Sequence, residues 1–259
     1  MGSTKDYVME MEEKSRDAWI ADHYPDAQVE SDEWESAAQH YRWFQDWMEE
    51  AAEQQCFEAS LACIPDRLEE AKGELHALEQ LLRHKQPDIV LRMAFVHAIT
   101  VMDSFLMYSA RALLHHPPHL ARFMQHAGVF VRNKQSRQAL RNAKWIEQEP
   151  EVDTPAEAYL RRAQALVGGM TFQSHKFIRD YFTTLLTTPH AWPLDEIAGL
   201  VRTRNDLVHR NGVSVSHEPV HIWPDRVQEA IRQVTALVVA AATTLLQEDA
   251  QYTPDNAAF

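Results

Sequence analysis

The chain of 259 residues carries a formal net charge of −13, is 45% hydrophobic and contains only two cysteines. This length holds one large or two modest domains, and the hydrophobic content suffices for a core. No apolar run approaches the length of a membrane span, and the chain starts without the charged-then-apolar pattern of a signal peptide. We therefore expect a cytoplasmic protein with no membrane partner.

Residues 1–85 form an acidic N-terminal region that we expect to be helical and that indicates no role of its own. Residues 1–90 hold 8 basic against 22 acidic side chains, net −14, whereas residues 91–259 hold 17 against 16, net +1. Such acidity is usually solvated surface, and the alternative is that it covers a basic segment farther along the chain. Five aromatic residues at helical spacing favour a packing seam over base-stacking platforms: Trp34, Tyr41, Trp43, Phe44 and Trp47.

Potential metal ligands are sparse. Cys56 and Cys63 are seven residues apart in a helical stretch, which predicts two small buried groups on one helix face. Two histidine groups, at residues 115–119 and 217–221, lack the cysteines or paired acidic ligands that a metal site requires. We interpret them as loop histidines, and we expect neither a metal nor another cofactor.

The region from residue 86 to residue 250 predicts a second domain built from helices. Only 7 glycines, several long helical periods and no clear alternating strands indicate an all-α fold, a helical bundle. An insertion is expected at about 117–165 and a disordered tail at 251–259. The expected helices span residues 88–115, 172–186, 193–211 and 225–247.

A basic segment includes most of the first of these helices and extends beyond it. Residues 91–144 hold eight basic side chains against one acid, Asp103, net +7. One interpretation is the solvated face of a short helix, but solvated faces usually contain compensating glutamates, which are missing here. The segment is therefore our candidate for a surface that contacts RNA phosphates. Its expected contact residues are Arg132, Lys134, Arg137, Arg141 and Lys144.

The run Arg-Asn-Asp-Leu-Val-His-Arg-Asn-Gly, from Arg204 to Gly212, carries the most information about function. It lies on an expected helix of about four turns that ends at Gly212, a typical left-handed cap. Arg204 falls in the middle of an apolar face, and Asn205 and His209 share the adjoining flank with Arg202 nearby. The plain alternative is an arginine that reaches out from the core edge and a histidine stabilised by the helix dipole. The apolar face comprises Ile197, Leu200, Val201, Leu207 and Val208.

This run resembles the signature of the HEPN superfamily, all-helical domains that include many metal-independent endoribonucleases of toxin, CRISPR and antiphage systems. The bare spacing is common, since Arg92 with His97 and Arg111 with His116 share it. The resemblance covers roughly residues 86–248 and is specific only in the motif. It implies RNA cleavage by attack of the 2′-hydroxyl on the adjacent phosphate, which leaves a 2′,3′-cyclic phosphate and a 5′-hydroxyl.

The resemblance also implies roles for individual residues and partners. His209 would move the protons, Arg204 would stabilise charge on the phosphorane oxygens, and Asn205 would orient the phosphate or the histidine. Two motifs meet across a two-fold axis in such nucleases, which implies a homodimer. A cognate antitoxin or sensor protein is a further possible partner. The supporting residues are Asp103, Asp206 and Arg202.

Asp103 lies on an apolar stripe of its own helix, where an unpaired carboxylate is costly, so we expect it to pair with Arg204. Two alternatives to a nuclease stay open. One is a HEPN-like module that binds RNA or a protein without cutting, and the other is a helical interaction protein in which the motif is coincidental.

Overall fold

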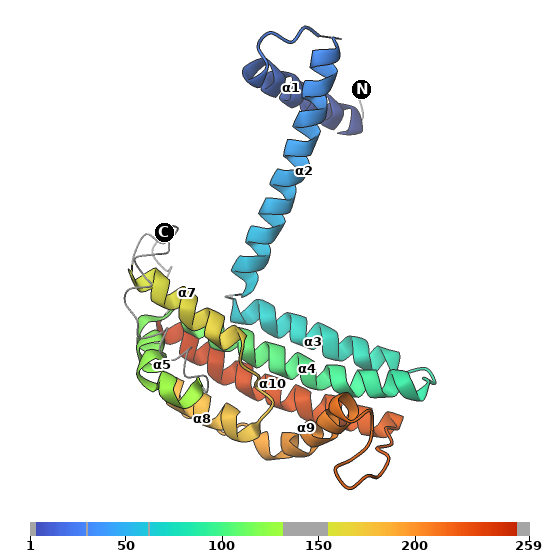
Figure 1. Cartoon of the computed structure of the whole chain (residues 1–259), viewed down its shortest axis with the longest axis vertical. Coiled ribbons are helices and arrows are strands. Elements are labelled where there is room, and N and C mark those ends of the chain that lie inside the picture. Colours follow the sequence, from blue (N-terminus) through green and yellow to red (C-terminus); the bar gives the residue numbers. More distant parts are fainter. Residues whose placement is uncertain (1–3, 30, 62, 132–154, 253–259) are drawn as a thin grey trace. The chain divides into compact units, whose positions relative to one another are not determined.

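The computed structural model of the chain describes residues 4–29, 31–61, 63–131 and 155–252. Nine helices run through these ranges, which contain no strand, and the only pairing of extended backbone there is an isolated bridge between Val213 and Pro219. The all-α fold expected from the glycine content and the helical periods is confirmed (Figure 1). The chain divides into two compact units, Met1–Ala59 and Ser60–Phe259, which we describe separately.

The first unit is a helical hairpin of α1 (Thr4–His23) and α2 (Asp32–Leu61). Its described contacts are aromatic: the ring of Trp19 lies 5.5 Å from that of Tyr41 and 5.7 Å from that of Phe44, centroid to centroid. Ile20 is fully buried beside this seam. The expected packing role holds for Tyr41 and Phe44, whereas Trp43 is 70% exposed on the outer face.

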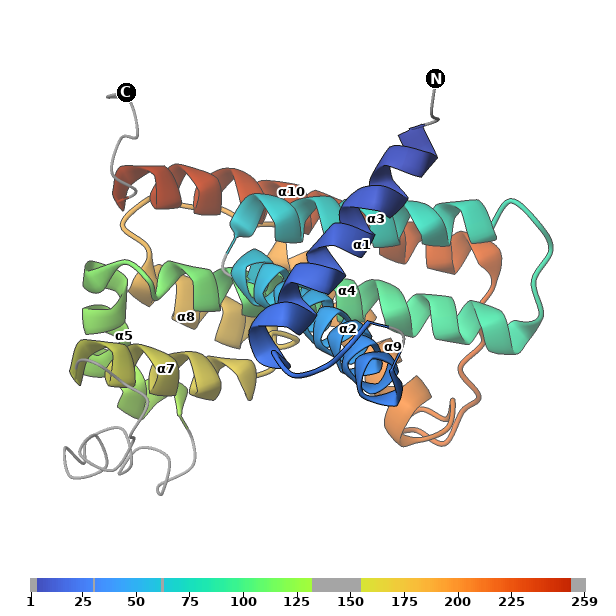
Figure 2. The same ribbon diagram turned by 90° about the horizontal axis from the view of Figure 1, so that it is seen from above.

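The second unit is a bundle centred on two long helices, α4 (Asp88–Leu113) and α10 (Pro224–Tyr252). α3 (Ile64–Leu81) packs against both, and α7 (Pro155–Gly168) and α9 (Leu194–His209) pack against α4. α5 (Pro117–Phe130) and α8 (His175–Leu185) close one end (Figure 2). The apolar periods of α4 and α10 create this arrangement, because each buries one continuous stripe. Their fully buried residues include Phe95, Ile99, Met102, Leu106, Val227, Ala230, Val234 and Leu237.

Two boundaries differ from those predicted from sequence. The second unit begins at Ser60 rather than after residue 85, because Ala71, Leu75 and Leu78 of α3 are buried in the shared core. Cys63 does not continue the preceding helix, because it is the extended residue that caps the start of α3 ahead of a proline. The prediction of one helix face carrying both cysteines is therefore wrong.

The C-terminal helix is longer than expected and runs to Tyr252, so residues 251 and 252 are helical rather than part of a tail. By length and composition, α4 and α10 would each suffice to cross a membrane, contrary to the expectation that no apolar run approaches that length. Half of each apolar window is buried inside the bundle, as in the core helices of many soluble proteins, so this is weak support for a membrane span.

The expected insertion is partly described: α5 and α7 are helices that pack on the bundle. The predicted RNA-contacting residues between α5 and α7 lie outside the described residues; they are Arg132, Lys134, Arg137, Arg141 and Lys144.

The histidines at the start of α5 are not the loose loop residues predicted from sequence. His119 is fully buried, and its Nε2 lies 2.8 Å from Oε1 of Glu248 on α10. The Glu248 carboxylate also accepts hydrogen bonds from the backbone and hydroxyl groups of Thr187 and Thr188. His116 pairs with Asp249 at 2.7 Å. Each histidine finds its partner far along the chain, 129 residues away for His119 and 133 residues away for His116. The two pairs thus fasten the start of α5 to α10.

Candidate functional site

The motif occupies the last turn and a half of α9. Pro193 precedes the helix, and Asp195 and Glu196 in its first turn complement the positive end of the helix dipole. At the other end Gly212 has φ 81°, and its backbone N–H donates to the carbonyl of Asp206 at 3.0 Å. Asn211 is also left-handed, with φ 52°. The glycine stop read from the sequence is therefore confirmed, because a residue with a Cβ is strained at this φ.

The apolar face of α9 is buried along most of its length but not at its end. Leu194, Ile197, Leu200 and Leu207 are buried, whereas Val208 is 46% exposed. Val208 has the angular position of a core residue, since it follows Ile197 by eleven residues, close to three full turns. Its prediction as a buried residue is wrong because nothing in the described chain covers this side of the last turn.

The three expected catalytic side chains are in contact. Nη1 of Arg204 donates to Oδ1 of Asn205 at 3.2 Å and lies 3.4 Å from Nε2 of His209. An arginine has no acceptor, so this second contact requires a lone pair on His209 Nε2, which corresponds to the neutral Nδ1–H tautomer. Asn205 and Arg204 are half-buried and His209 is exposed. A basic nitrogen therefore faces solvent beside a permanent cation.

Arg204 is incompletely satisfied. Its Nε is buried and has no hydrogen-bond acceptor among the described residues. A buried donor left without a partner costs about 1–3 kcal/mol, and such groups are rare in folded proteins. The guanidinium is thus not placed to maximise the stability of this chain alone.

The expected ion pair between Asp103 and Arg204 is wrong. One Asp103 oxygen accepts from the backbone N–H of Phe172 at 2.5 Å, and the other accepts from Nε2 of Gln173 at 2.7 Å. Both donors lie between α7 and α8, so Asp103 holds that connection against α4. The carboxylate of Asp103 does have partners, as expected for a charge on an apolar stripe. They are the backbone amide of Phe172 and the side chain of Gln173, not Arg204.

Asp206 and Arg202 stay outside the catalytic contact. Asp206 pairs with Arg210 at 2.7 Å one turn later, and its carbonyl accepts the N–H groups of Arg210 and Gly212. It therefore shapes the end of the helix rather than the chemistry. Arg202 is exposed and forms no ion pair within the described ranges.

The three copies of the Arg-x4-His spacing behave differently. His97 pairs with Glu74 of α3 at 2.7 Å, and His116 pairs with Asp249 of α10. In neither case does the histidine contact the arginine five residues before it in the described structure. Only His209 meets its arginine, because it ends its helix and has no carboxylate neighbour within the described residues. The tertiary structure thus separates the one copy in which the histidine meets its arginine from two copies whose histidines pair with carboxylates of other helices.

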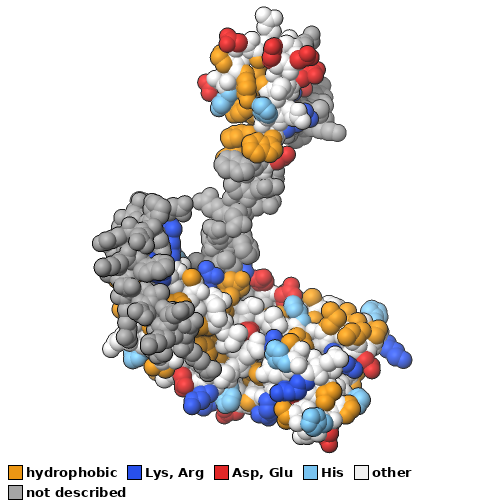
Figure 3. All heavy atoms as spheres, in the orientation of Figure 1, with side chains coloured by type: hydrophobic (Ala, Val, Ile, Leu, Met, Phe, Trp, Pro, Cys, Tyr) orange, Lys and Arg blue, Asp and Glu red, His pale blue; other side chains and the backbone are white. Residues whose placement is uncertain are grey.

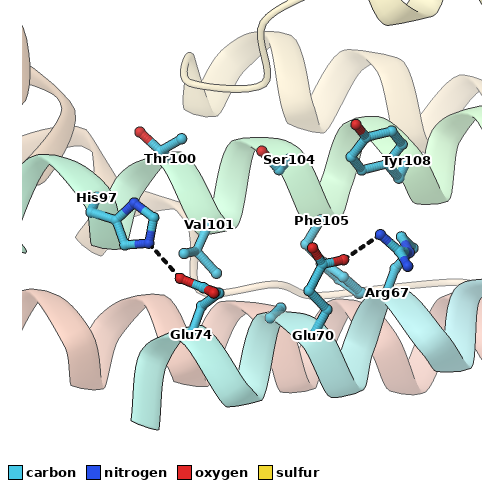
Figure 4. Close-up of a pocket in the computed structure, with 10 residues that line it drawn as sticks. Arg67, Glu70, Glu74, His97, Thr100, Val101, Ser104, Phe105 and Tyr108 are labelled. Atoms are coloured by element: carbon cyan, nitrogen blue, oxygen red, sulfur yellow. Dashed lines mark hydrogen bonds and ion pairs between the residues drawn. The ribbon is translucent and has the colours of Figure 1, made fainter. Parts of the chain in front are cut away.

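Two hollows are lined by residues of α4. One, of about 290 Å³, lies between α3 and α4, where the pair His97–Glu74 joins the two helices and the pair Arg67–Glu70 lies farther along α3 (Figure 4). The other, of about 260 Å³, lies where α4 and α10 begin.

The second hollow includes Arg92, which belongs to the basic segment 91–144 but was not among its expected contact residues. A Cβ built on Gly212 would lie 3.4 Å from Nη1 of Arg92, so this guanidinium lies close to the turn that ends the motif. The signal in the sequence was weak, because residues 92 and 212 are separated by most of the domain.

Comparisons of the chain with protein-family models, with curated proteins and with solved structures gave no significant match. The site is therefore interpreted from its own residues and from the motif.

Proposed function

We propose that this protein is a metal-independent endoribonuclease of the HEPN type that acts in a toxin or antiphage defence system. The observation that carries the proposal is the contact of Arg204 with both Asn205 and His209 at the open end of α9. The HEPN-like run of residues from Arg204 to Gly212 supports it.

The proposed chemistry uses the substrate's own nucleophile. His209 Nε2 takes the proton of the ribose 2′-hydroxyl, and the oxygen attacks the adjacent phosphorus. The 5′-oxygen of the next nucleotide leaves and takes up a proton, which gives a 2′,3′-cyclic phosphate and a 5′-hydroxyl. The Arg204 guanidinium, released from His209 by the substrate, stabilises the charge on the phosphorane oxygens. Asn205 holds Arg204 in position through its Oδ1.

A homodimer is part of the proposal. One chain supplies one motif histidine for two proton transfers, and a second chain would supply the other. Three valines near His209 are exposed and available for such an interface: Val208 at 46%, Val213 at 37% and Val215 at 70%. Apolar groups of this kind are expected at the buried core of an interface. The cytoplasmic location is retained as the expectation from the sequence pattern, and a cognate antitoxin or sensor as partner rests on the resemblance alone.

An assay of total RNA in excess EDTA tests the activity. We expect the wild type to cut and His209→Ala to lose about 10²–10⁴-fold in rate, the usual range for a general acid or base. The control is His76→Ala, an exposed histidine on α3, which should cut normally. The 5′-hydroxyl ends of the products should be substrates for a polynucleotide kinase without prior removal of a phosphate. A 2′-deoxy sugar at the cleavage position should block the cut.

Three results would contradict the proposal in different ways. Activity that disappears on chelation and returns with Mg²⁺ or Mn²⁺ removes the metal-free mechanism. Cleavage by His209→Ala at the wild-type rate removes His209 from the chemistry. RNA binding without any cleavage by the wild type selects a non-catalytic HEPN-like module.

A further inference from the structure

We propose that the hollow at the start of α4 and α10 is a binding subsite for one unpaired nucleotide of the RNA, in which Trp223 stacks on the base and Arg92 with Lys85 binds its phosphate. The proposal rests on the proposed function and extends it, because it assigns single-stranded RNA as the substrate class. It also places a recognition contact beside the motif turn.

The aromatic part of the subsite is an exposed tryptophan. Trp223 lines the hollow and is 58% exposed, although indoles are usually well buried. Its ring lies nearly parallel to that of His221, with an interplanar angle of 16° and centroids 6.2 Å apart. Ile222 between them is buried, which anchors the segment while both rings stay at the surface. A flat face held in this way is what base stacking requires.

The charged part of the subsite is basic. Lys85 and Arg92 line the hollow with one acid, Asp88, and neither basic side chain forms an ion pair in the part of the chain that the structure describes. The first turns of α4 and α10 border the same space, since Asp88 and Pro224 line it. Helix N-termini carry partial positive charge, so both helices add to the attraction for a phosphate.

The backbone connects this hollow to the motif. After Gly212 the chain makes a short loop in which Val213 pairs with Pro219, and the N–H of Val220 donates to the carbonyl of Gly212 at 2.8 Å. The loop therefore returns His221 and Trp223 to the motif turn. The guanidinium of Arg92 lies close to that turn at Gly212. Basic, histidine and hydrophobic side chains gather over this end of the bundle, at the lower right of Figure 3.

The volume of the hollow limits the size of the group that it can hold. Its volume of about 260 Å³ is below the range of about 300–1,000 Å³ that holds drug-sized molecules, so it suits one base rather than a larger group. A base in a duplex is stacked on both sides and has no free face to offer. The subsite should therefore select single strands over duplexes.

Binding of a fluorescein-labelled six-nucleotide RNA with 2′-fluoro sugars, which lacks the attacking hydroxyl, tests the subsite by fluorescence anisotropy. Trp223→Ala should raise the Kd about tenfold, since the base loses the aromatic face on which it stacks. Trp223→Phe keeps an aromatic face and should bind within about threefold of the wild type. Arg92→Gln should weaken binding and reduce the slope of log K against log salt by about 0.7, one phosphate contact.

The matched control is Trp43→Ala, which removes another exposed tryptophan from the first unit and should leave the Kd unchanged. A duplex of the same sequence should bind more weakly and should not distinguish Trp223→Ala from the wild type. A Kd that does not change in Trp223→Ala overturns the subsite, as does an equal loss of duplex binding.

The outcomes for the subsite and for the nuclease are separable. Binding that depends on Trp223 in a protein that never cuts RNA supports the subsite and refutes the nuclease. Cleavage that depends on His209, together with a Kd for RNA that does not change in Trp223→Ala, supports the nuclease and refutes the subsite. A wild type that binds no RNA refutes both.

Discussion

The two ends of the bundle place histidines beside charged groups in opposite ways. At the closed end, His119 and Glu248 are fully buried, and Glu248 also accepts hydrogen bonds from Thr187 and Thr188. At the open end, His209 is exposed, and its nearest charged contact is the guanidinium of Arg204. Saturated contacts stabilise a fold, whereas a histidine paired with an arginine gains little and keeps its nitrogen available. The comparison indicates that the histidines of the closed end hold the fold together, whereas His209 at the open end stays accessible.

The largest expected effect concerns the open end. Arg204→Ala should lower the cleavage rate about 10²–10³-fold, because the developing charge on the phosphorane loses its donor. Stability should change little, since Asp103 has partners of its own and does not depend on Arg204. Single-turnover cleavage and urea unfolding measure the two quantities. A large loss of stability with normal cleavage would make Arg204 a structural residue.

The matching change at the closed end should have the opposite signature. Glu248→Leu leaves His119 and the N–H groups of Thr187 and Thr188 without an acceptor, which should cost about 3 kcal/mol of unfolding free energy. Cleavage by the folded fraction should persist. Glu229→Gln, which removes a surface carboxylate from the same helix, is the control and should be nearly neutral. Equal stability of both variants in urea would remove the structural role of the cluster.

Acid should destabilise the protein through the closed end. Burial would raise the pKa of Glu248, but hydrogen bonds from Thr188 and Thr187 outweigh it and lower the pKa to about 2. Burial also lowers the pKa of His119, although its bond to Glu248 opposes this.

For both groups the folded pKa lies below the unfolded one, so the unfolded chain binds more protons and stability falls as the pH is lowered. The loss should begin below about pH 6.5 through His119 and continue from about pH 4.3 toward 2 through Glu248. Urea midpoints measured from pH 7 to pH 3 check this. In Glu248→Leu the urea midpoint should fall less steeply with decreasing pH below about pH 4.3. An unchanged pH dependence in that range would assign the acid sensitivity to other groups.

A smaller effect should follow from changing the exposed apolar surface of the open end. Val208→Glu should weaken the homodimer about tenfold or more, because a charge enters the core of the interface. Val239→Glu on α10 starts from the same 46% exposure and is the matched control. Sedimentation of the wild type at micromolar concentration should report about twice 29.9 kDa. A wild-type monomer that cuts RNA with constant activity per chain on dilution would contradict the composite site.

The smallest effect is expected from the part of the basic segment that lies outside the described residues. Neutralising Arg137, Arg141 and Lys144 together should weaken RNA binding and flatten its salt dependence, while slow cleavage survives at saturating RNA. The salt slope should fall by about 0.7 for each lost contact to a single strand. An unchanged slope would return these residues to ordinary solvated surface.

Local features of this protein were readable from its sequence because short-range physics produces them. The apolar periods at residues 88–115 and 225–247 predicted the two core helices, since each buries one face whatever its partner is. Gly212 predicted the left-handed end of α9, because glycine adopts that conformation without strain.

Only the tertiary structure decided which distant groups meet. Asp103 required a partner, and a backbone amide 69 positions later provides it in place of Arg204. Val208 occupies a core angle on its helix yet is exposed, because burial depends on whether a neighbouring helix reaches that turn. The same holds for His119 with Glu248 and for Arg92 with Gly212. A sequence states which side chains need a partner, whereas the packing of whole helices determines which partner each one finds.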